Sequence, residues 1–169
     1  MRYIAVDPSG SFNEGKGHTG ISIVDDWDWN TLTTLSLSAK SYTNRHTYWK
    51  TIIDIVTRTC KDVVVIIESF VVRSNGFLVG KMPETSLLIG ALVYELERLG
   101  IPYIFQSPSQ AKTRFKDEYL GKYIPNYEMK IKSDKAYYYI NGIMTNDHER
   151  DSLKHLLYFM KYGGVVYGK

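Results

Sequence analysis

Residues 2–11 read RYIAVDPSGS, a short apolar strand that ends at Asp7 and is followed by a turn of proline, serine and glycine residues. A carboxylate at this place lies at the edge of a sheet, where its side chain can reach a ligand. Two further acidic residues occur in comparable settings. Glu68 ends the apolar run at 63–67, and Asp151 lies on the last predicted helix. Because a divalent cation needs several oxygen ligands from different segments, the three carboxylates together suggest a metal site.

The composition is that of one compact domain. The chain has 169 residues, 44% of them hydrophobic, which suits a single domain over 1–169 with a sizeable core. Its formal charge of +3 permits an anionic partner but is too small to identify one. The single cysteine, Cys60, excludes an internal disulfide, and no stretch approaches the roughly 20 apolar residues of a membrane span. We therefore expect a cytoplasmic protein with no membrane partner.

Hydrophobic periodicity predicts an α/β domain with a mixed sheet and helices packed on it. Residues at the start of the chain indicate an antiparallel meander of three strands, and the run at 63–67 fits a central strand covered on both faces. The helix that ends at Leu99 carries enough apolar residues to bury two faces. The expected elements are strands at 2–7, 18–24 and 31–37, a helix at 43–59, a strand at 63–67, a helix at 83–99, a strand at 101–105 and a helix at 108–115.

The last third of the chain is less regular. The segment at 116–135 is polar, basic and rich in tyrosine, and it has no clear period, so we expect a mobile or ligand-facing excursion. A final helix begins near Asn146. Its expected core residues are Leu153, Leu156, Leu157 and Met160.

The positions of the carboxylates make a prediction about the fold. Asp7 and Glu68 can meet only if the strands that they end are neighbours in the sheet. On the last helix, Asp147 and Asp151 are four residues apart and His148 and Asp151 are three apart, so either pair can share one helix face. Phosphodiester cleavage with two metal ions needs such a cluster, because the ions lie about 4 Å apart.

Each of these residues also has a simpler explanation. An aspartate before a proline, such as Asp7, commonly begins a turn, and Asp147 is placed to cap the last helix. Glu68 can be paired at the edge of the core, whereas His148 and Asp151 can be solvated residues of the first helical turns. No residue decides the matter alone, but chance rarely places acidic residues on two strand ends and a helix in this way.

Three motifs occur in order along the chain: IAVDPSGS at 4–11 followed by TGI at 19–21, IIE at 66–68 and HERDSL at 148–153. They resemble the motifs of the RuvC-type Holliday junction resolvases, a family of ribonuclease H-like nucleases, and especially of its shorter phage members. The resemblance covers nearly the whole chain. It implies a mixed five-stranded sheet, in which three antiparallel strands are followed by parallel strands, with helices on both faces.

The resemblance also implies a metal-dependent endonuclease that resolves four-way DNA junctions as a homodimer, by paired symmetric nicks that leave 5′-phosphate and 3′-hydroxyl ends. Asp7, Glu68, His148 and Asp151 would be the catalytic residues and would hold two Mg²⁺ ions, with Asp147 as an alternative or outer ligand. One ion would help to generate the attacking hydroxide, and the other would stabilise the leaving 3′ oxygen. A histidine leaves the site less negative than a carboxylate does, which favours Mn²⁺ as a substitute.

The family also places basic and aromatic residues near the scissile strand. Lys112 and Lys135 lie in segments similar to its two lysine-bearing segments, and we expect them to contact phosphates, although each is equally explained as a solvated lysine. Phe70 and Phe77 are candidates for an aromatic wedge against unstacked bases, and either also fits a core position. The apolar helix at 87–99 suits a homodimer.

Other functions are compatible with parts of this pattern. A glycine-rich loop after a strand also occurs in actin-like ATPases and sugar kinases, but those need a second such domain, and the stretch at 15–17 is not a P-loop that would bind a nucleotide cofactor. A non-catalytic DNA-binding module of the same fold would not need all three acidic positions. A relaxed debranching nuclease for forks and flaps stays as an alternative to strict junction resolution.

Overall fold

A five-stranded sheet forms the centre of the molecule. The computed structural model describes residues 1–13, 15–58, 62–69 and 84–168. The first three strands are antiparallel, the later pairs are parallel, and the order is β3-β2-β1-β4-β5. The first and fourth strands are neighbours, as the positions of their carboxylates require. The strands are β1 (Arg2–Asp7), β2 (His18–Asp25), β3 (Asp28–Ser38), β4 (Val63–Glu68) and β5 (Tyr103–Gln106).

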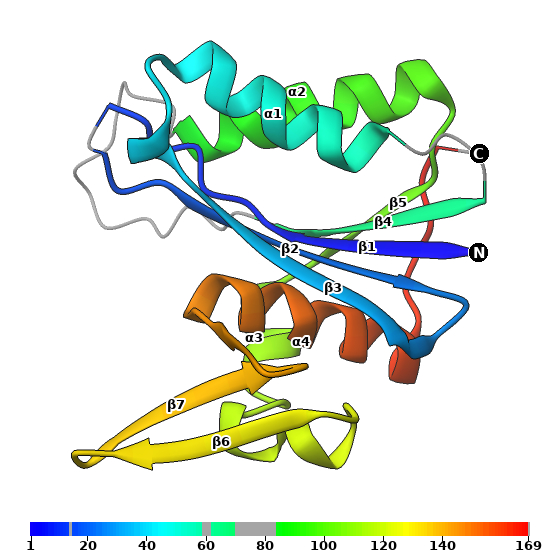
Figure 1. Cartoon of the computed structure of the whole chain (residues 1–169). Helices are drawn as coiled ribbons and strands as arrows, with labels where there is room; N and C mark the ends of the chain where they lie inside the picture. Colours follow the sequence, from blue (N-terminus) through cyan, green and yellow to red (C-terminus); the bar gives the residue numbers. More distant parts are fainter. Residues whose placement is uncertain (14, 59–61, 70–83, 169) are drawn as a thin grey trace.

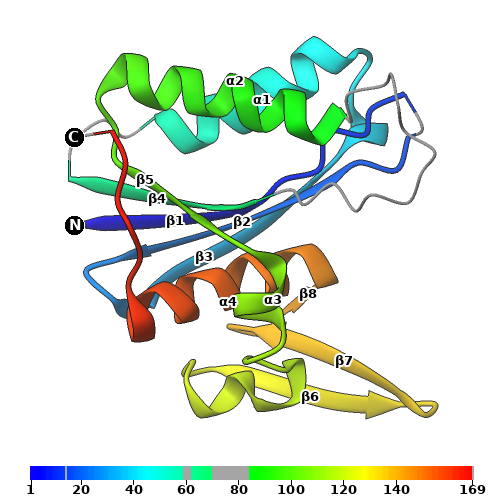
Figure 2. The ribbon, with the colours of Figure 1, turned by 180° about the vertical axis from the view of Figure 1, so that it is seen from behind.

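Helices cover both faces of this sheet, as expected (Figure 1). α1 (Arg45–Thr57) and α2 (Glu84–Leu99) lie together on one face, and α4 (Asp147–Tyr162) crosses the other with the short α3 (Pro108–Lys112) beside it (Figures 1 and 2). A 3-10 turn, η1 (Ala39–Ser41), links β3 to α1. Among the described residues, no helix is long and apolar enough to cross a membrane.

The alternation of side chains explains why the central strands are apolar throughout. In β1, Ile4 and Val6 point into the core beneath α1 and α2, whereas Ala5 points into the core beneath α4. In β4, Val65 points into the core beneath α1 and α2, and Ile66 points into the core beneath α4. The side chains of all five residues are completely buried. A strand covered on both faces needs an apolar residue at every position, which is the pattern that the sequence shows.

Within the single chain, α2 buries one face rather than the two that the sequence indicates. Its outer side carries Leu87 and Tyr94, which are 41% and 65% exposed. The 3.6-residue period allows a single stripe to face the sheet, and the additional apolar residues lie beside or opposite that stripe. The buried residues are Thr85, Leu88, Leu92 and Leu96.

In α4, the expected core residues are buried with one exception. Leu153, Leu156 and Leu157 are inaccessible to solvent, but Met160 is 41% exposed, so its expected place on the core side was wrong. The buried stripe continues from Leu156 to Phe159, three residues further on, and Phe159 packs against the core beneath α4.

A second sheet lies where the sequence suggested an irregular excursion. The segment at 116–135 contains the 3-10 helix η2 (Asp117–Lys122) and the strand β6 (Tyr127–Lys132), so it has regular structure that the sequence analysis did not predict. β6 pairs with β7 (Lys135–Ile140), which pairs with β8 (Ile143–Thr145), and all neighbours are antiparallel. This three-stranded sheet lies on the α4 side of the molecule, away from α1 and α2 (Figure 1).

The sequence does contain a signal for this sheet. Tyr127, Met129 and Ile131 alternate with charged residues, which is the period of a strand. Ser133 and Asp134 then adopt positive φ angles of 50° and 60°, as the two central residues of a tight hairpin turn require. The lysines between the apolar residues raise the polarity of the segment and obscure its alternation.

One close contact fixes the position of α4 on the sheet. Gly20 of β2 lies beside Asp7 of β1 in the sheet, on the face that α4 covers. A Cβ atom at Gly20 would lie 1.9 Å from the carbonyl oxygen of His148, in the first turn of α4. Only a glycine therefore allows the start of α4 to approach the carboxylate of Asp7 so closely.

We expect the Gly20→Ala substitution to lower the free energy of unfolding by about 3 kcal/mol or more, because α4 or β2 must shift to accept the added methyl group. The matched control is Gly90→Ala on the exposed side of α2, where a Cβ meets nothing within 4 Å. That control should raise the free energy of unfolding by about 0.5–1 kcal/mol. Urea unfolding measures both values, and equal stabilities of the two variants would contradict the proposed close contact.

Candidate active site

The carboxylates of Asp7 and Glu68 lie on one face of the sheet, at the ends of two neighbouring parallel strands. Asp7 follows Ala5 on the face that α4 covers, and Glu68 follows Ile66 on the same face. The register pairs Ala5 with Ile66, so both carboxylates reach the same edge of the sheet. Asp7 is only 8% exposed, and a carboxylate buried to this degree needs polar partners.

The turn after Asp7 is anchored by side chains from α1. The hydroxyl of Tyr48 donates to the carbonyl of Ser9 at 2.9 Å, and the indole N–H of Trp49 donates to the carbonyl of Gly10 at 3.2 Å. The backbone N–H of Ser9 donates to Thr19 Oγ1 at 3.0 Å. These bonds satisfy backbone groups that have left the sheet, so the end of β1 is held without a ligand.

A capping box begins α4 and orients its first turn. The Asn146 side chain accepts from the backbone N–H of Glu149 at 3.0 Å, and the Glu149 carboxylate accepts from the backbone N–H of Asn146 at 2.8 Å. Asn146 is therefore the cap, in place of Asp147. The side chain of Asp147 is 86% exposed and pairs with Arg150, so the structure does not bring it to the other carboxylates.

Lys112 joins three of the carboxylates that the sequence singled out. Its Nζ atom lies 3.5 Å from Asp7, 2.8 Å from Glu68 and 2.9 Å from Asp151. Burial lowers the pKa of the Lys112 ammonium, but the charges of Asp7 and Glu68 outweigh burial and raise this pKa above its ordinary value. Carboxylates from β1, β4 and α4 thus converge on the positive charge of Lys112, the last residue of α3.

His148 forms a fourth side of this cluster. Its Nδ1 atom lies 3.1 Å from Asp7 Oδ2, and its ring stacks on that of His18 with centroids 5.4 Å apart. Burial raises the pKa of the Asp7 carboxyl, the bond with His148 opposes this, and the charge of Glu68 adds to it. The bond with Asp7 in turn raises the pKa of His148.

Sequence reasoning missed His155, which is completely buried between the sheet and α4. Its Nε2 atom lies 2.8 Å from Glu68 Oε2, and its Nδ1 atom lies 2.8 Å from the side-chain oxygen of Gln106 on β5. Both ring nitrogens thus have a polar partner inside the core, as buried polar groups require. The residue could have been found, because it lies one helical turn after Asp151 on the same stripe.

His155 and Lys112 together determine the ionisation of Glu68. Burial favours the neutral acid, but the hydrogen bonds from His155 and Lys112 favour the carboxylate more strongly and lower its pKa to about 2. Glu68 and Asp7 therefore have pKa shifts in opposite directions, although they lie on adjacent strands.

A second group of charges supports Asp151 from behind. Lys154 bridges Asp151 at 2.8 Å and Asp117 at 2.6 Å, and Arg150 bonds the other oxygen of Asp117 at 2.8 Å. Arg150 and Lys154 are only 6% and 7% exposed. Asp151 is thus a member of a buried ion-pair network rather than a solvated surface charge, and Asp117 connects η2 to this network.

The remaining sequence candidates lie elsewhere or outside the described structure. Lys135 is an exposed residue at the start of β7, and no ion pair with it is found among the described residues. Phe70 and Phe77, the two candidates for an aromatic wedge, lie outside the described residues.

Comparison of the whole structure with solved structures identifies the fold. One similar structure is that of Thermus thermophilus RuvC in complex with a Holliday junction substrate, with a TM-score of 0.60, 16% identity, and 96% of this chain and 94% of that chain covered. The chain has the fold of RuvC. A second structure of T. thermophilus RuvC has a TM-score of 0.56 at 16% identity, covering 97% of this chain and 98% of that chain.

The likeness to RuvC extends over nearly the full length of both chains, and it confirms the expected ribonuclease H-like arrangement of a mixed five-stranded sheet with helices on both faces. At 16% identity this likeness establishes the fold alone. Neither the protein-family models nor the curated protein sequences give a match to the chain.

We expect the His155→Leu substitution to raise the pKa of Glu68 by about one to two units, because a hydrogen bond to a charged group contributes about 1.5–3 kcal/mol and one unit corresponds to about 1.4 kcal/mol. Leucine keeps most of the buried volume of the imidazole. Carbon-13 NMR titration of the Glu68 carboxyl gives the value. The control is His46→Leu in the exposed first turn of α1, and the same Glu68 pKa in both variants would contradict a role for His155.

Proposed function

We propose that this protein is a metal-dependent, structure-specific endonuclease that resolves four-way DNA junctions by paired symmetric nicks, leaving 5′-phosphate and 3′-hydroxyl ends. The observation that carries this proposal is the convergence of Asp7, Glu68 and Asp151 on the ammonium of Lys112. The RuvC fold and its occurrence in a protein bound to a Holliday junction support the choice of substrate. In this proposal, residues 1–169 form a single nuclease domain.

The donor set suits hard divalent cations. Three carboxylates from β1, β4 and α4 already surround the Lys112 ammonium at one sheet edge, and the imidazole of His148 bonds to one of them, Asp7. Among the described residues, no group of three or more acidic or histidine side chains is arranged around one ion position. The Lys112 ammonium lies between the carboxylates instead, so an entering cation must displace it.

We propose that Asp7, Glu68, His148 and Asp151 hold two Mg²⁺ ions, with Mn²⁺ as a substitute that the imidazole favours. When bound, such ions activate a water molecule for attack and stabilise the leaving oxygen. His155 orients the Glu68 carboxylate and keeps it ionised, and Lys154 orients the carboxylate of Asp151 through a hydrogen bond.

Lys112 has a second role in this proposal. Its side chain is 29% exposed and reaches the cluster from the last residue of α3. Once cations neutralise the carboxylates, the ammonium loses its partners and is free to contact the phosphate beside the site. Lys112 therefore balances the charge of the empty cluster and contacts the substrate when the cluster is filled.

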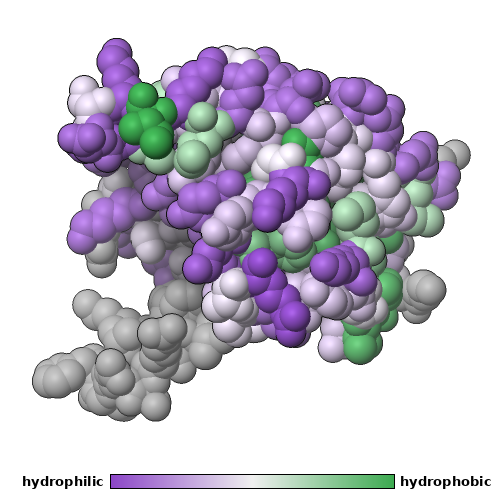
Figure 3. Space-filling view, turned by 90° about the horizontal axis from the view of Figure 1, so that it is seen from below, coloured by the Kyte–Doolittle hydropathy of each residue, from purple (hydrophilic) through white to green (hydrophobic). Residues whose placement is uncertain are grey.

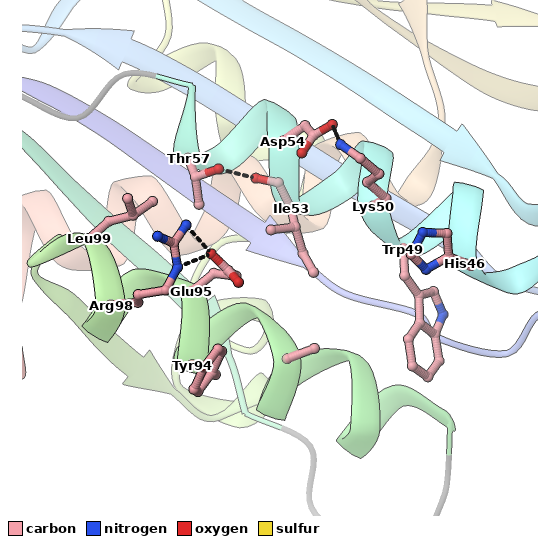
Figure 4. A pocket seen from close by; sticks show the side chains of 11 residues that line it. His46, Trp49, Lys50, Ile53, Asp54, Thr57, Tyr94, Glu95, Arg98 and Leu99 are labelled. Carbon is pink, nitrogen blue, oxygen red and sulfur yellow. Dashed lines mark hydrogen bonds and ion pairs between the residues drawn. The ribbon is translucent and has the colours of Figure 1, made fainter.

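A four-way junction with two equivalent strands requires two active sites, and we propose a homodimer. The support is a groove between α1 and α2 on the side of the molecule opposite α4 (Figure 4). Trp49 and Ile53 of α1 and Tyr94 of α2 line it, and its rim carries the ion pairs Lys50–Asp54 and Arg98–Glu95. An apolar centre with a charged rim is the composition of a protein interface.

Glu68→Gln should bind four-way junctions but nick them at least about 100-fold more slowly than the parent protein. The substitution removes the negative charge of a proposed metal ligand and keeps the size of the side chain. The assay uses labelled four-way, three-way, flap and linear DNA with Mg²⁺, Mn²⁺ or chelator. Paired symmetric nicks confined to the four-way substrate support resolution, and equal cutting of all branched forms indicates a debranching nuclease. Nicking by Asp7→Asn at the parental rate would contradict the proposed site, and junction binding without nicking by the parent protein would indicate a non-catalytic module.

Tyr94→Glu should weaken dimerisation at least about tenfold, because it places an unpaired charge at the apolar centre of the proposed interface. Sedimentation velocity over a range of protein concentrations measures the dimer dissociation constant. Tyr119→Glu on η2 is the control, since Tyr119 is similarly exposed at 52% but lies on the α4 side of the sheet. A monomeric parent protein, or an unchanged constant in Tyr94→Glu, would contradict this interface.

A further inference from the structure

The β6–β7–β8 sheet has two chemically different faces. One face packs on the body of the molecule through Tyr138 and Ile140, which are 9% and 4% exposed. The other face, here called the outer face, points away from this contact because side chains alternate along a strand. Its residues are Glu128, Lys130, Lys132, Lys135, Tyr137, Tyr139 and Met144.

The outer face carries an excess of positive charge that the fold does not need. Lys132 and Lys135 are directly opposite each other in the register, at the end of the hairpin. Like charges in this position destabilise a strand pair. Lys130 pairs with Glu128 at 3.1 Å, which leaves the other two lysines without a carboxylate partner among the ion pairs found in the described residues. An anionic partner would remove this repulsion.

Tyrosine side chains lie between these lysines. Lys130 is opposite Tyr137 in the register, and its ammonium lies 4.8 Å from the centre of the Tyr139 ring. A shallow hollow on this sheet therefore combines ammonium groups, phenol hydroxyls and aromatic edges, all of which bind a sugar-phosphate backbone. The residues that line it are Lys130, Ile131, Lys132, Ser133, Tyr137, Tyr139 and Met144.

The sheet is firmly connected to the active site. The guanidinium of Arg150 in α4 lies 4.5 Å from the centre of the Tyr138 ring and donates to the carbonyl of Thr145 at 2.9 Å. β8 ends at Thr145, so the chain passes directly from this sheet into the cap of α4 and on to His148. A ligand on the outer face is thus held at a defined position relative to the carboxylate cluster.

The turn between β6 and β7 lies on the same side of the molecule as the candidate active site. Figures 1 and 2 show β6 and β7 projecting from the α4 side of the molecule, with the turn between them on the side where β1 and β4 end. Seen from below, the surface is mostly hydrophilic, and the projecting end combines hydrophilic groups with a hydrophobic one (Figure 3).

We propose that the outer face of the β6–β7–β8 sheet binds the sugar-phosphate backbone of a DNA arm outside the active site. The proposal rests on the proposed function, because it assigns a position to the substrate of that same nuclease. Lys130, Lys132 and Lys135 contact phosphates, and the two tyrosines position the strand. The sheet sets how strongly a branched substrate is held, whereas the carboxylate cluster performs the cleavage.

The test is the binding of a labelled four-way junction by Lys130→Ala/Lys132→Ala, measured by fluorescence anisotropy with chelator present so that no strand is cut. We expect at least a fivefold weaker affinity. Each lost phosphate contact removes about 0.9 from the slope of log affinity against log salt, so between about 50 and 200 mM salt the slope should fall by about 1.8. The double variant Lys130→Arg/Lys132→Arg should keep both the affinity and the slope.

The control is Arg58→Ala/Lys161→Ala, which removes the same net charge from the exposed ends of α1 and α4. It should bind the junction as the parent protein does. If the alanine variant of the sheet matches this control in affinity and salt slope, the inference is overturned, and nicking by the parent protein would leave the proposed function intact. If the parent protein binds junctions through these lysines but cuts no DNA with any metal, the nuclease proposal fails and the binding surface remains.

Discussion

The parallel pairing of β1 with β4 is the constraint on which the candidate site depends. Its register aligns Ala5 with Ile66, so the residues two further on, Asp7 and Glu68, reach the same edge on the same face. A shift of one residue would turn one of the two carboxylates to the opposite face, into the core beneath α1 and α2. Such a shift is unfavourable because it would bury a carboxylate in an apolar core without polar partners. The same register therefore specifies the core and the site.

The carboxylates of the candidate site repel one another, and surrounding residues compensate for this repulsion. Three acidic groups in a partly buried site repel one another, and Lys112, His148 and His155 each place a hydrogen-bond donor against them. Lys154 and Arg150, which are themselves buried, extend the compensation to Asp117. These contacts balance the carboxylates without a cation, and in the proposed function a divalent ion takes their place after Lys112 withdraws.

The three-stranded sheet adds a different kind of charge to the same fold. Its inner face is part of the core beneath α4, and its outer face collects lysines that repel one another across the strand pair. In the proposed complex, the DNA backbone balances these charges. The negative cluster and the positive sheet are joined by the short segment from Thr145 to His148, so a substrate that contacts both has a defined orientation.

The sequence alone determined the apolar strands, the helices and the acidic positions at 7, 68 and 151, because each of these follows from local periodicity or from a residue at the end of an element. It predicted that β1 and β4 are neighbours only through the hypothesis that Asp7 and Glu68 share a site. It also contained the alternation of β6, although the lysines concealed it. Tertiary structure alone decided that Lys112 lies among the carboxylates, that His155 bonds Glu68, and that Asp147 faces solvent. These outcomes depend on how α3 and α4 dock on the sheet, and local periodicity carries no information about contacts between segments that are far apart in the chain.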